Sequence, residues 1–255
     1  MLSWQSIISA QDANLRMALF QSFWFGDGLP KFAVMAMQSF LDHGHDYHLY
    51  SYSGLELPAG ARLLDAGQIL PSNRVFHYRQ PDGSRGSVSA FSNLFRYEML
   101  RRNGGWWIDT DVVCLSRDVP QTDTFWGWQD LKWICSAILK VPPGHPLAEQ
   151  AFHEADAAGT DITWGQCGPY MVTRLVRQLG LEDRSCPPEI AYPVYHTEHL
   201  LPVTTEGHDE AVRRLDGKPF LHLWHEKFRR SNDPRIDNPE PGSFLDTVYR
   251  RHAAR

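Results

Sequence analysis

Two aspartates one residue apart, Asp109 and Asp111, have the types and spacing to do chemistry. They follow the run Gly104–Ile108, in which a glycine turn leads into an apolar strand. Side chains alternate along extended backbone with a period of two, so both carboxylates can point to the same side. Like charges held so close repel unless a cation lies between or beside them, and aspartate oxygens select Mg²⁺ or Mn²⁺. The stretch predicts a metal–diphosphate anchor, and the alternative is a pair of turn-capping residues.

A second polar feature precedes the aspartates in the chain. The pattern predicts a helix from about Ser87 to Arg102, on which Asn93 and Arg96 are three residues apart and share a face. A guanidinium on that face could hydrogen-bond a phosphate. It could instead pair with a neighbouring carboxylate, either Glu98 or Asp109.

The elements expected to position these residues alternate between strands and helices. A strand, a helix and a strand at the observed spacing are typical of the start of a nucleotide-binding α/β sheet. We expect strands at Gln21–Phe25, Tyr47–Tyr52, Phe125–Trp128, Trp133–Val141, Tyr192–Tyr195 and Phe220–Trp224. We expect the other helices from Pro30 to Gly44, Pro146 to Ala157, Pro169 to Leu179 and after Ser243, with Glu182–Glu210 otherwise irregular and Ser231–Ser243 mostly loop. No linker is visible, which predicts a single domain over residues 1–255.

Composition narrows the class of protein. The 255 residues are 42% hydrophobic and 12% aromatic, enough for a substantial buried core. The formal net charge is -5 without a basic block, so nucleic acid is not expected as a partner. Four dispersed cysteines without a CxxC pair indicate reduced thiols. The first residues predict neither a signal peptide nor a transmembrane segment, so we expect a cytoplasmic location, free or peripheral at the inner face of the membrane.

Five ordered blocks of the chain resemble a known group of enzymes. The blocks are Phe23–Gly26, Phe95–Leu100, Gly104–Asp111, Trp164–Arg174 and His222–Trp224. Together they are similar to the DxD-motif sugar transferases of the glycosyltransferase family 32 type, which include capsular and α-1,4-glycosyltransferases and yeast outer-chain mannosyltransferases. Clostridial glucosylating toxins share the core motif more distantly.

The resemblance implies both a fold and an activity. It implies a GT-A-type nucleotide-diphospho-sugar transferase fold, an α/β fold whose mixed, mostly parallel central sheet is flanked by helices. It also implies a metal-dependent, retaining hexosyltransferase that moves a sugar from a nucleotide-sugar donor to a saccharide, lipid-linked saccharide or glycoconjugate acceptor, as in polysaccharide biosynthesis. Two alternatives are a non-catalytic nucleotide-sugar-binding domain of the same fold and a toxin-like glycosyltransferase that modifies a protein.

The resemblance also assigns roles to residues. It implies metal ligation by Asp109, Asp111 and His222, with Asp111 as the main direct ligand. A neutral imidazole suits Mn²⁺ better than Mg²⁺. It implies catalytic roles for Asp109, Asp111 and Arg96, and no residue stands out as a covalent nucleophile. The expected donor-binding residues are Phe23, Trp24, Phe25, Asn93, Arg96, Gly105, Asp109, Gln166, Gly168 and Pro169.

The sequence departs from the family pattern at two places, and several of the assigned residues have an alternative interpretation. Asn93 stands where the family usually has aspartate, and Cys135-Ser136 stands where an asparagine is common. His222 could be a core histidine, since an isolated histidine in an apolar strand often is. Trp24 and Phe25 could be plain core residues, and so could Trp106 and Trp107. The basic stretch His225–Arg230 could be a mobile segment that closes over the diphosphate or a solvated face.

Overall fold

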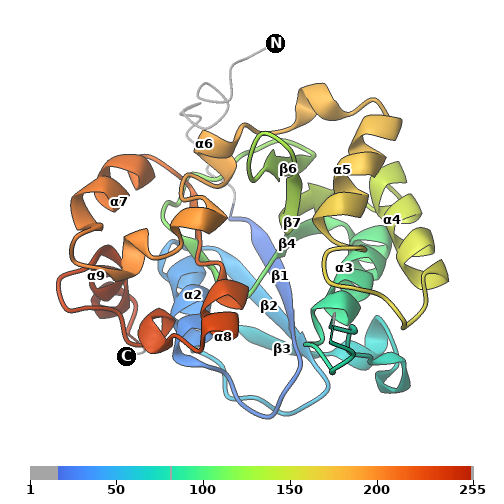
Figure 1. Cartoon of the computed structure of the whole chain (residues 1–255), viewed down its shortest axis with the longest axis horizontal. Coiled ribbons are helices and arrows are strands. Elements are labelled where there is room, and N and C mark those ends of the chain that lie inside the picture. Colours follow the sequence, from blue (N-terminus) through green and yellow to red (C-terminus); the bar gives the residue numbers. More distant parts are fainter. Residues whose placement is uncertain (1–16, 81, 254–255) are drawn as a thin grey trace.

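The computed structural model describes residues 17–80 and 82–253, which are built around a six-stranded sheet in the order β3-β2-β1-β4-β7-β6 (Figure 1). Its strands are β1 (Leu19–Trp24), β2 (Asp46–Ser51), β3 (Arg62–Asp65), β4 (Gly105–Ile108), β6 (Phe125–Trp128) and β7 (Ile134–Val141). Strands β1 to β4 pair in parallel, whereas β7 is antiparallel to both β4 and β6. The expected mixed, mostly parallel sheet flanked by helices is confirmed.

A second, two-stranded sheet joins distant parts of the chain. It pairs β5 (Val112–Cys114) with β8 (Phe220–His222) in antiparallel register, so that Val112 lies opposite His222. The strand expected at Phe220–Trp224 is therefore present but ends at His222. This pairing brings the C-terminal part of the chain to the residues that follow β4.

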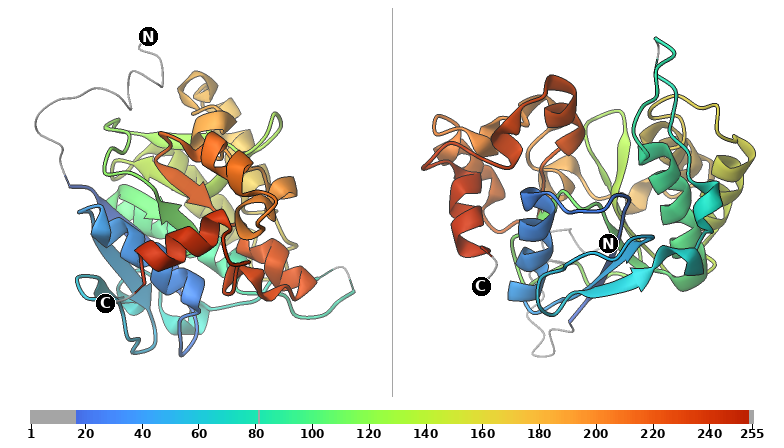
Figure 2. Two further views of the ribbon diagram at one scale, coloured as in Figure 1. Left: turned by 90° about the vertical axis from the view of Figure 1, so that its left-hand side faces the viewer. Right: turned by 90° about the horizontal axis from the view of Figure 1, so that it is seen from below.

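Helices cover both faces of the central sheet. They are α2 (Lys31–Asp42), α3 (Ser89–Asn103), α4 (Pro146–Ala157), α5 (Pro169–Gln178), α6 (Pro188–Ala191), α7 (His208–Leu215), α8 (His225–Ser231) and α9 (Phe244–Arg251). Figures 1 and 2 show α3, α4 and α5 on one side and α2, α7, α8 and α9 on the other. None of the helices in the described part of the chain has the length and apolar character needed to cross a membrane.

The core is divided by the sheet, and β4 contributes to both halves. Trp106 packs in the cluster with Phe20 and Phe220, whereas Trp107 packs in the cluster with Phe95. Successive side chains of a strand point to opposite faces, which explains the division. Both tryptophans are buried, so their interpretation as core residues is confirmed.

Gly104 makes the sharp transition from α3 to β4. Its φ of +62° is a conformation that glycine adopts without steric cost. A Cβ at this position would also lie 2.5 Å from the backbone nitrogen of Pro143. Any larger residue would therefore force apart the helix end and the chain beside it, and the aspartates after β4 would shift with them.

Several expectations for the C-terminal half are wrong. No strand forms at Tyr192–Tyr195, because the buried Tyr192 side chain turns inward to accept a hydrogen bond from the backbone nitrogen of Ile138, and Pro193 has no N–H for a ladder. The segment expected to be irregular holds α6, short 3₁₀ helices at Glu182–Arg184, His196–Glu198 and Leu201–Val203, and the start of α7. The basic stretch after Trp224 is helix α8, and β3 was not expected at all.

Candidate active site

Asp109 and Asp111 lie at the end of β4, where the chain turns into β5. The backbone nitrogen of Asp109 donates to the carbonyl of Ala137 on β7 at 2.8 Å. The nitrogen of Val112 then donates to the carbonyl of Asp109 at 3.1 Å and closes the turn. One ligand atom from each of Asp109, Asp111 and His222 lies within 4.8 Å of the other two. The two aspartates therefore face a common point, as their spacing predicted.

His222 reaches Asp111 through the pairing of β5 with β8. Its Nε2 lies 3.2 Å from Oδ2 of Asp111, and the backbone nitrogen of Leu223 donates to the Asp111 carbonyl at 2.9 Å. The ring of Trp224 packs on the imidazole with 4.0 Å between centroids. His222 is thus buried, yet it is directed at a carboxylate and is not enclosed by apolar side chains alone.

Arg96 is a buried cation that pairs with Asp109. One terminal nitrogen donates to Oδ1 of Asp109 at 2.5 Å, and the other donates to Oγ of Ser136 at 2.7 Å and to Oδ1 of Asn93. The indole nitrogen of Trp107 donates to the same Asp109 oxygen at 2.7 Å. Of the two carboxylates considered as partners of Arg96, Asp109 is the one that it contacts.

Glu98, the other candidate partner, belongs to a separate network. It is buried, and it forms ion pairs with Arg101 and Arg102 one turn further along α3. The middle of α3, from Leu94 to Leu100, is buried all round, and its two charged side chains, Arg96 and Glu98, each form ion pairs with specific partners.

The pKa values of Asp111 and His222 are both strongly shifted, in opposite directions. Burial alone would raise the pKa of Asp111, but the nearby His222 and the backbone N–H of His225 hold it well below its usual value. Burial likewise would lower the pKa of His222, yet the charge of Asp111 raises it to about 10. Without a metal ion, a proton on His222 therefore provides the positive charge next to Asp111.

The three residues fit a divalent cation. Within residues 17–80 and 82–253, Oδ2 of Asp109 and Oδ1 of Asp111 accept no hydrogen bond, because the known donors use the other oxygen of each carboxylate. Two carboxylate oxygens and one imidazole nitrogen form a donor set that suits Mn²⁺, and their oxygens also suit Mg²⁺. Asp109, Asp111 and His222 could therefore hold such an ion.

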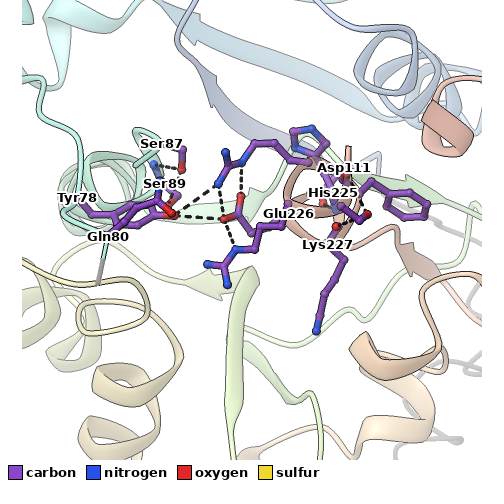
Figure 3. Close-up of polar contacts among 12 residues, drawn as sticks. Tyr78, Gln80, Ser87, Ser89, Asp111, His225, Glu226 and Lys227 are labelled. Atoms are coloured by element: carbon purple, nitrogen blue, oxygen red, sulfur yellow. Dashed lines mark hydrogen bonds and ion pairs between the residues drawn. The ribbon is translucent and has the colours of Figure 1, made fainter. Parts of the chain in front are cut away.

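Helix α8 begins directly at this cluster. Trp224 has a left-handed backbone with φ of +58°, which is uncommon for a non-glycine residue. The resulting bend directs the backbone nitrogen of His225 to Oδ2 of Asp111 at 2.8 Å (Figure 3). The indole nitrogen of Trp224 donates to the carbonyl of Val194 at 2.9 Å, which secures the strained residue.

Glu226 and Lys227 on α8 point in different directions, as Figure 3 shows. Glu226 forms ion pairs with Arg229 and Arg230 and accepts a hydrogen bond from the hydroxyl of Tyr78 at 3.3 Å. Lys227 is exposed, and its ammonium has no hydrogen bond or ion pair with the described residues. The predicted basic stretch is thus an ordered helix with one unpaired lysine.

The aromatic residues predicted to bind the donor occupy three environments. Phe23 is a core residue stacked on Phe95, with 4.4 Å between ring centroids, so its side chain is not available to a ligand. Trp24 is half-buried, and its indole nitrogen donates to the carbonyl of Gly28 at 2.9 Å. Phe25 is exposed. Trp24 and Phe25 keep their predicted role as a proposal.

Of the remaining predicted residues, Gly168 approaches the Arg96 network. Gly168 lies so close to Asn93 that a Cβ there would be 3.3 Å from the Asn93 side-chain nitrogen, and Pro169 begins α5. Gln166 is exposed in the loop before this helix. Gly105 has φ of +85° at the start of β4, where the Gln21 side chain lies beside it.

Ser136 contacts Arg96, and Tyr78 and Glu226 anchor the helix that begins at the cluster, but none of the three was expected from the sequence. Ser136 holds Arg96, and the other two connect α8 to the segment before α3. Ser136 was noticed only as a departure from the family pattern. Tyr78 and Glu226 have no local signal, because their contact joins residues 148 positions apart.

Comparison with known proteins gives similar structures but no sequence match. No protein-family model and no curated protein matches the chain. The structure is similar to that of the PaToxG glycosyltransferase, with 10% identity, a TM-score of 0.47 and coverage of 98% of this chain and 90% of the other. It is similar to the WbbM bifunctional glycosyltransferase in its apo structure, with 12% identity, a TM-score of 0.46 and coverage of 92% and 51%.

The apo-form glycosyltransferase GlyE of Streptococcus pneumoniae TIGR4 is also similar, with 10% identity, a TM-score of 0.40 and coverage of 81% of this chain and 54% of the other. The chain thus spans about half the length of the WbbM and GlyE structures. At these identities and TM-scores, the function has to be argued from the site itself.

Proposed function

We propose that the protein is a metal-dependent, retaining glycosyltransferase that moves a hexose from a nucleotide-sugar donor to a saccharide, lipid-linked saccharide or glycoconjugate acceptor. One observation carries the proposal: ligand atoms of Asp109, Asp111 and His222 converge within 4.8 Å at the end of a strand in a mixed α/β sheet. The sequence resemblance to DxD sugar transferases, which rests on the same residues, supports it.

Asp111, His222 and Asp109 would hold the divalent ion, with Mn²⁺ favoured over Mg²⁺ because of the imidazole ligand. A bound ion would supply Lewis acidity to the diphosphate that leaves when the sugar is transferred. The low pKa of Asp111 keeps it ionised and ready to bind. His222 must lose its proton to become a ligand, so metal and proton compete for the same nitrogen.

Arg96 acts in this proposal as a positioning residue. Both of its terminal nitrogens are engaged by Asp109, Ser136 and Asn93, so it orients Asp109 and balances its charge. The expectation that Arg96 also contacts the donor directly remains a prediction beside this role through Asp109. Asn93, which stands where the family usually has aspartate, supports the guanidinium through its side-chain oxygen.

Residues on α8 and β1 complete the proposed donor site. We assign to Lys227, whose ammonium has no ion pair among the described residues, the neutralisation of a diphosphate oxygen; it follows by two residues the backbone N–H that contacts Asp111. Trp24 and Phe25 at the end of β1 provide surfaces on which a nucleobase can stack. Gln166, Gly168 and Pro169 border the sugar side. Retention of anomeric configuration follows from the resemblance, and the anomeric signal of the product by NMR tests it.

A thermal-shift experiment tests the proposal. The wild-type protein is melted with a panel of UDP-, GDP- and ADP-sugars, each with MnCl₂ or with EDTA. A ligand that binds the folded form raises its melting temperature, so we expect at least one donor to do so only with Mn²⁺. Asp111→Asn should lose this shift. Asp216→Asn, which changes an exposed aspartate after α7, is the matched control and should keep it.

Three outcomes would contradict parts of the proposal. Equal shifts in MnCl₂ and EDTA would reject the metal site, and a normal shift in Asp111→Asn would reject its main ligand. A Mn²⁺-dependent shift without release of nucleotide in the presence of any saccharide acceptor would favour the non-catalytic alternative. Transfer of sugar from a labelled donor to protein alone would favour the protein-modifying alternative.

A further inference from the structure

Exposed aromatic rings gather beside the proposed active site. Among the described residues, the aromatic side chains that are largely exposed are Phe25 (42%), Trp164 (43%) and Tyr170 (44%). Trp164 lies in the loop that leads into α5, Tyr170 is the second residue of this helix, and Tyr170 packs on the partly exposed Trp133. We refer to Trp164, Tyr170 and Trp133 as the aromatic strip.

Two of the three rings are in direct contact, and the third lies in the loop before α5. The rings of Tyr170 and Trp133 lie 4.5 Å apart at an angle of 52°. Gly165, which follows Trp164, has φ of +82°, and a Cβ there would lie 3.0 Å from the Tyr170 ring, so a glycine is needed where the loop passes this ring. The exposed rings therefore depend on a specific backbone conformation of the loop, unlike single hydrophobic residues scattered over a surface.

A cation covers each end of the strip. The ammonium of Lys132 lies 4.9 Å from the centre of the Trp133 ring, and the guanidinium of Arg230 lies 4.7 Å from that of Trp164. The strip therefore combines exposed ring faces with hydrogen-bond donors at its two ends. A ligand that fits it needs apolar patches and polar edges along the same length.

Two connections lead from the strip toward the metal-ligand cluster. At one end, Arg230 pairs with Glu226 on α8, next to the residue whose N–H contacts Asp111. At the other end, Trp133 precedes β7 and lies four positions before Ala137, whose carbonyl accepts from Asp109. Four positions of extended chain span roughly 13 Å. The strip can thus hold a molecule whose end reaches the cluster.

We propose that the aromatic strip binds the acceptor of the transfer reaction as an oligosaccharide of more than one sugar ring, so that its terminal hydroxyl is presented near Asp109. This inference rests on the proposed function. The C–H faces of pyranose rings pack on aromatic faces, and their hydroxyl edges hydrogen-bond to the flanking Lys132 and Arg230. A nucleobase would need only one ring, whereas the strip offers three, of which Trp133 and Tyr170 are in contact.

Affinity electrophoresis tests the proposal with soluble polysaccharides as probes. The native protein is run in gels containing yeast mannan, dextran, xylan or galactan, at several concentrations, to obtain dissociation constants. We expect at least one polysaccharide to retard the wild-type protein. Trp164→Ala and Tyr170→Ala should each raise that dissociation constant about tenfold, since each removes one stacking surface. Both side chains are largely exposed, so the folds of the variants are expected to persist, and thermal melting checks this.

Two matched variants and one second measurement separate the alternatives. Val212→Ala changes an exposed residue on α7 and should not alter retardation. Leu131→Ser changes a side chain that is 97% exposed near Trp133 and should have little effect, because an aliphatic side chain offers no ring face. The strip variants should keep the Mn²⁺-dependent thermal shift with a nucleotide sugar, which reports on the donor site alone.

Several results would overturn the proposal. These are a lack of retardation by every polysaccharide, or retardation that is lost in Leu131→Ser but kept in Trp164→Ala, which would indicate a protein-docking surface. Loss of the nucleotide-sugar shift in Trp164→Ala or Tyr170→Ala would instead make the strip a nucleobase platform. If the wild-type protein shows no nucleotide-sugar shift, the proposed function itself fails, whatever the gels show.

Discussion

The two carboxylates of the candidate site have different partners. Asp109 is 28% exposed at its side chain and pairs with Arg96, which is almost fully buried and always charged. The side chain of Asp111 is 11% exposed and pairs with His222, which can gain or lose a proton. One carboxylate is thus balanced by a permanent cation, whereas the other is balanced by a proton that a metal ion can replace.

The different partners of Asp109 and Asp111 explain how the site can be stable both without and with a metal ion. The Arg96 network holds Asp109 in one orientation whether or not an ion is bound, because the guanidinium is itself anchored by Ser136 and Asn93. In the proposed metal site, the Asp111–His222 pair would exchange a proton for the ion, so the charge between the two residues would stay positive in either state. The orientation of Asp109 is therefore set by protein contacts, whereas the Asp111–His222 pair is the part whose protonation would change when a metal binds.

The largest expected effect is on catalysis. Asp111→Asn removes the main proposed ligand, and the loss of metal-assisted stabilisation of the leaving group should lower kcat/KM by about 100-fold or more. Initial rates of nucleotide release with MnCl₂ and a saccharide acceptor measure the change, with Asp216→Asn as the control. A rate within about twofold of wild type would remove Asp111 from the mechanism.

The second effect concerns stability and distinguishes the two carboxylates directly. Asp109→Asn leaves Arg96 buried with its charge unbalanced, so it should lower the free energy of unfolding by about 2 kcal/mol. Asp111→Asn should cost less than about 1 kcal/mol, because His222 can become neutral when its partner charge is removed. Urea unfolding in EDTA compares the two variants.

A double variant gives the control for this comparison. Adding Arg96→Met to Asp109→Asn removes the unbalanced cation, and we expect part of the lost stability to return. If Asp111→Asn proves the more destabilising single variant, the distinction between Asp109, which pairs with a permanent cation, and Asp111, which pairs with a titratable histidine, is wrong.

The third effect is a dependence of metal affinity on pH. The pKa of His222 is raised to about 10 in the metal-free protein, so a proton must leave before Mn²⁺ binds. Between about pH 6 and pH 8, the dissociation constant for Mn²⁺ should fall by about tenfold per pH unit, since one proton is released. Isothermal titration calorimetry in buffers of different ionisation enthalpy measures both the affinity and the proton count.

The raised pKa of His222 also predicts how the stability of the metal-free protein changes at high pH. A histidine with a raised pKa stabilises the folded state fully below about pH 6.5 and loses that contribution as the pH rises through about 10. Melting temperatures in EDTA should therefore fall over this range. His222→Gln should remove both the pH slope of Mn²⁺ binding and this stability loss, and an unchanged slope in that variant would contradict the assignment.

The smallest expected effect is at the bend before α8. Trp224→Phe keeps an aromatic ring beside His222 but removes the indole donor to the carbonyl of Val194. A buried carbonyl that loses its donor costs about 1 kcal/mol. Urea unfolding should show this loss, and the Mn²⁺ affinity should change by less than about threefold. A larger change in affinity would mean that the indole hydrogen bond also positions Asp111 and His222.

The parts of the site that were predictable are local in the chain. The glycine turn, the apolar β4 and the two aspartates follow one another within eight residues, so period-two alternation was enough to place both carboxylates together. Helix α4 was predicted with its observed bounds, and α3 to within two residues, because each has clear end signals. The pairing of Arg96 with Asp109 was among the alternatives but could not be chosen, since Glu98 is much nearer to Arg96 in sequence than Asp109 is.

The parts that were not predictable depend on contacts between distant residues. Tyr192–Tyr195 has the composition of a strand, yet the Tyr192 side chain is used to fill the space beneath β7. Helix α8 begins after a left-handed tryptophan, a conformation that has no local signal. The aromatic strip joins Trp133 to residues more than thirty positions later, and only the packing of α5 against β7 brings them together.

The sequence by itself therefore determined the acidic pair, the strand that presents it and the general α/β architecture, because alternation and turn residues act over a few neighbouring positions. The tertiary structure alone decided which cation balances each carboxylate and which surface lies beside them. Those choices depend on the antiparallel pairing of β5 with β8 and on the burial of α3. A buried charge is costly unless it is paired, and the elements that carry the partners meet only when the whole chain has folded.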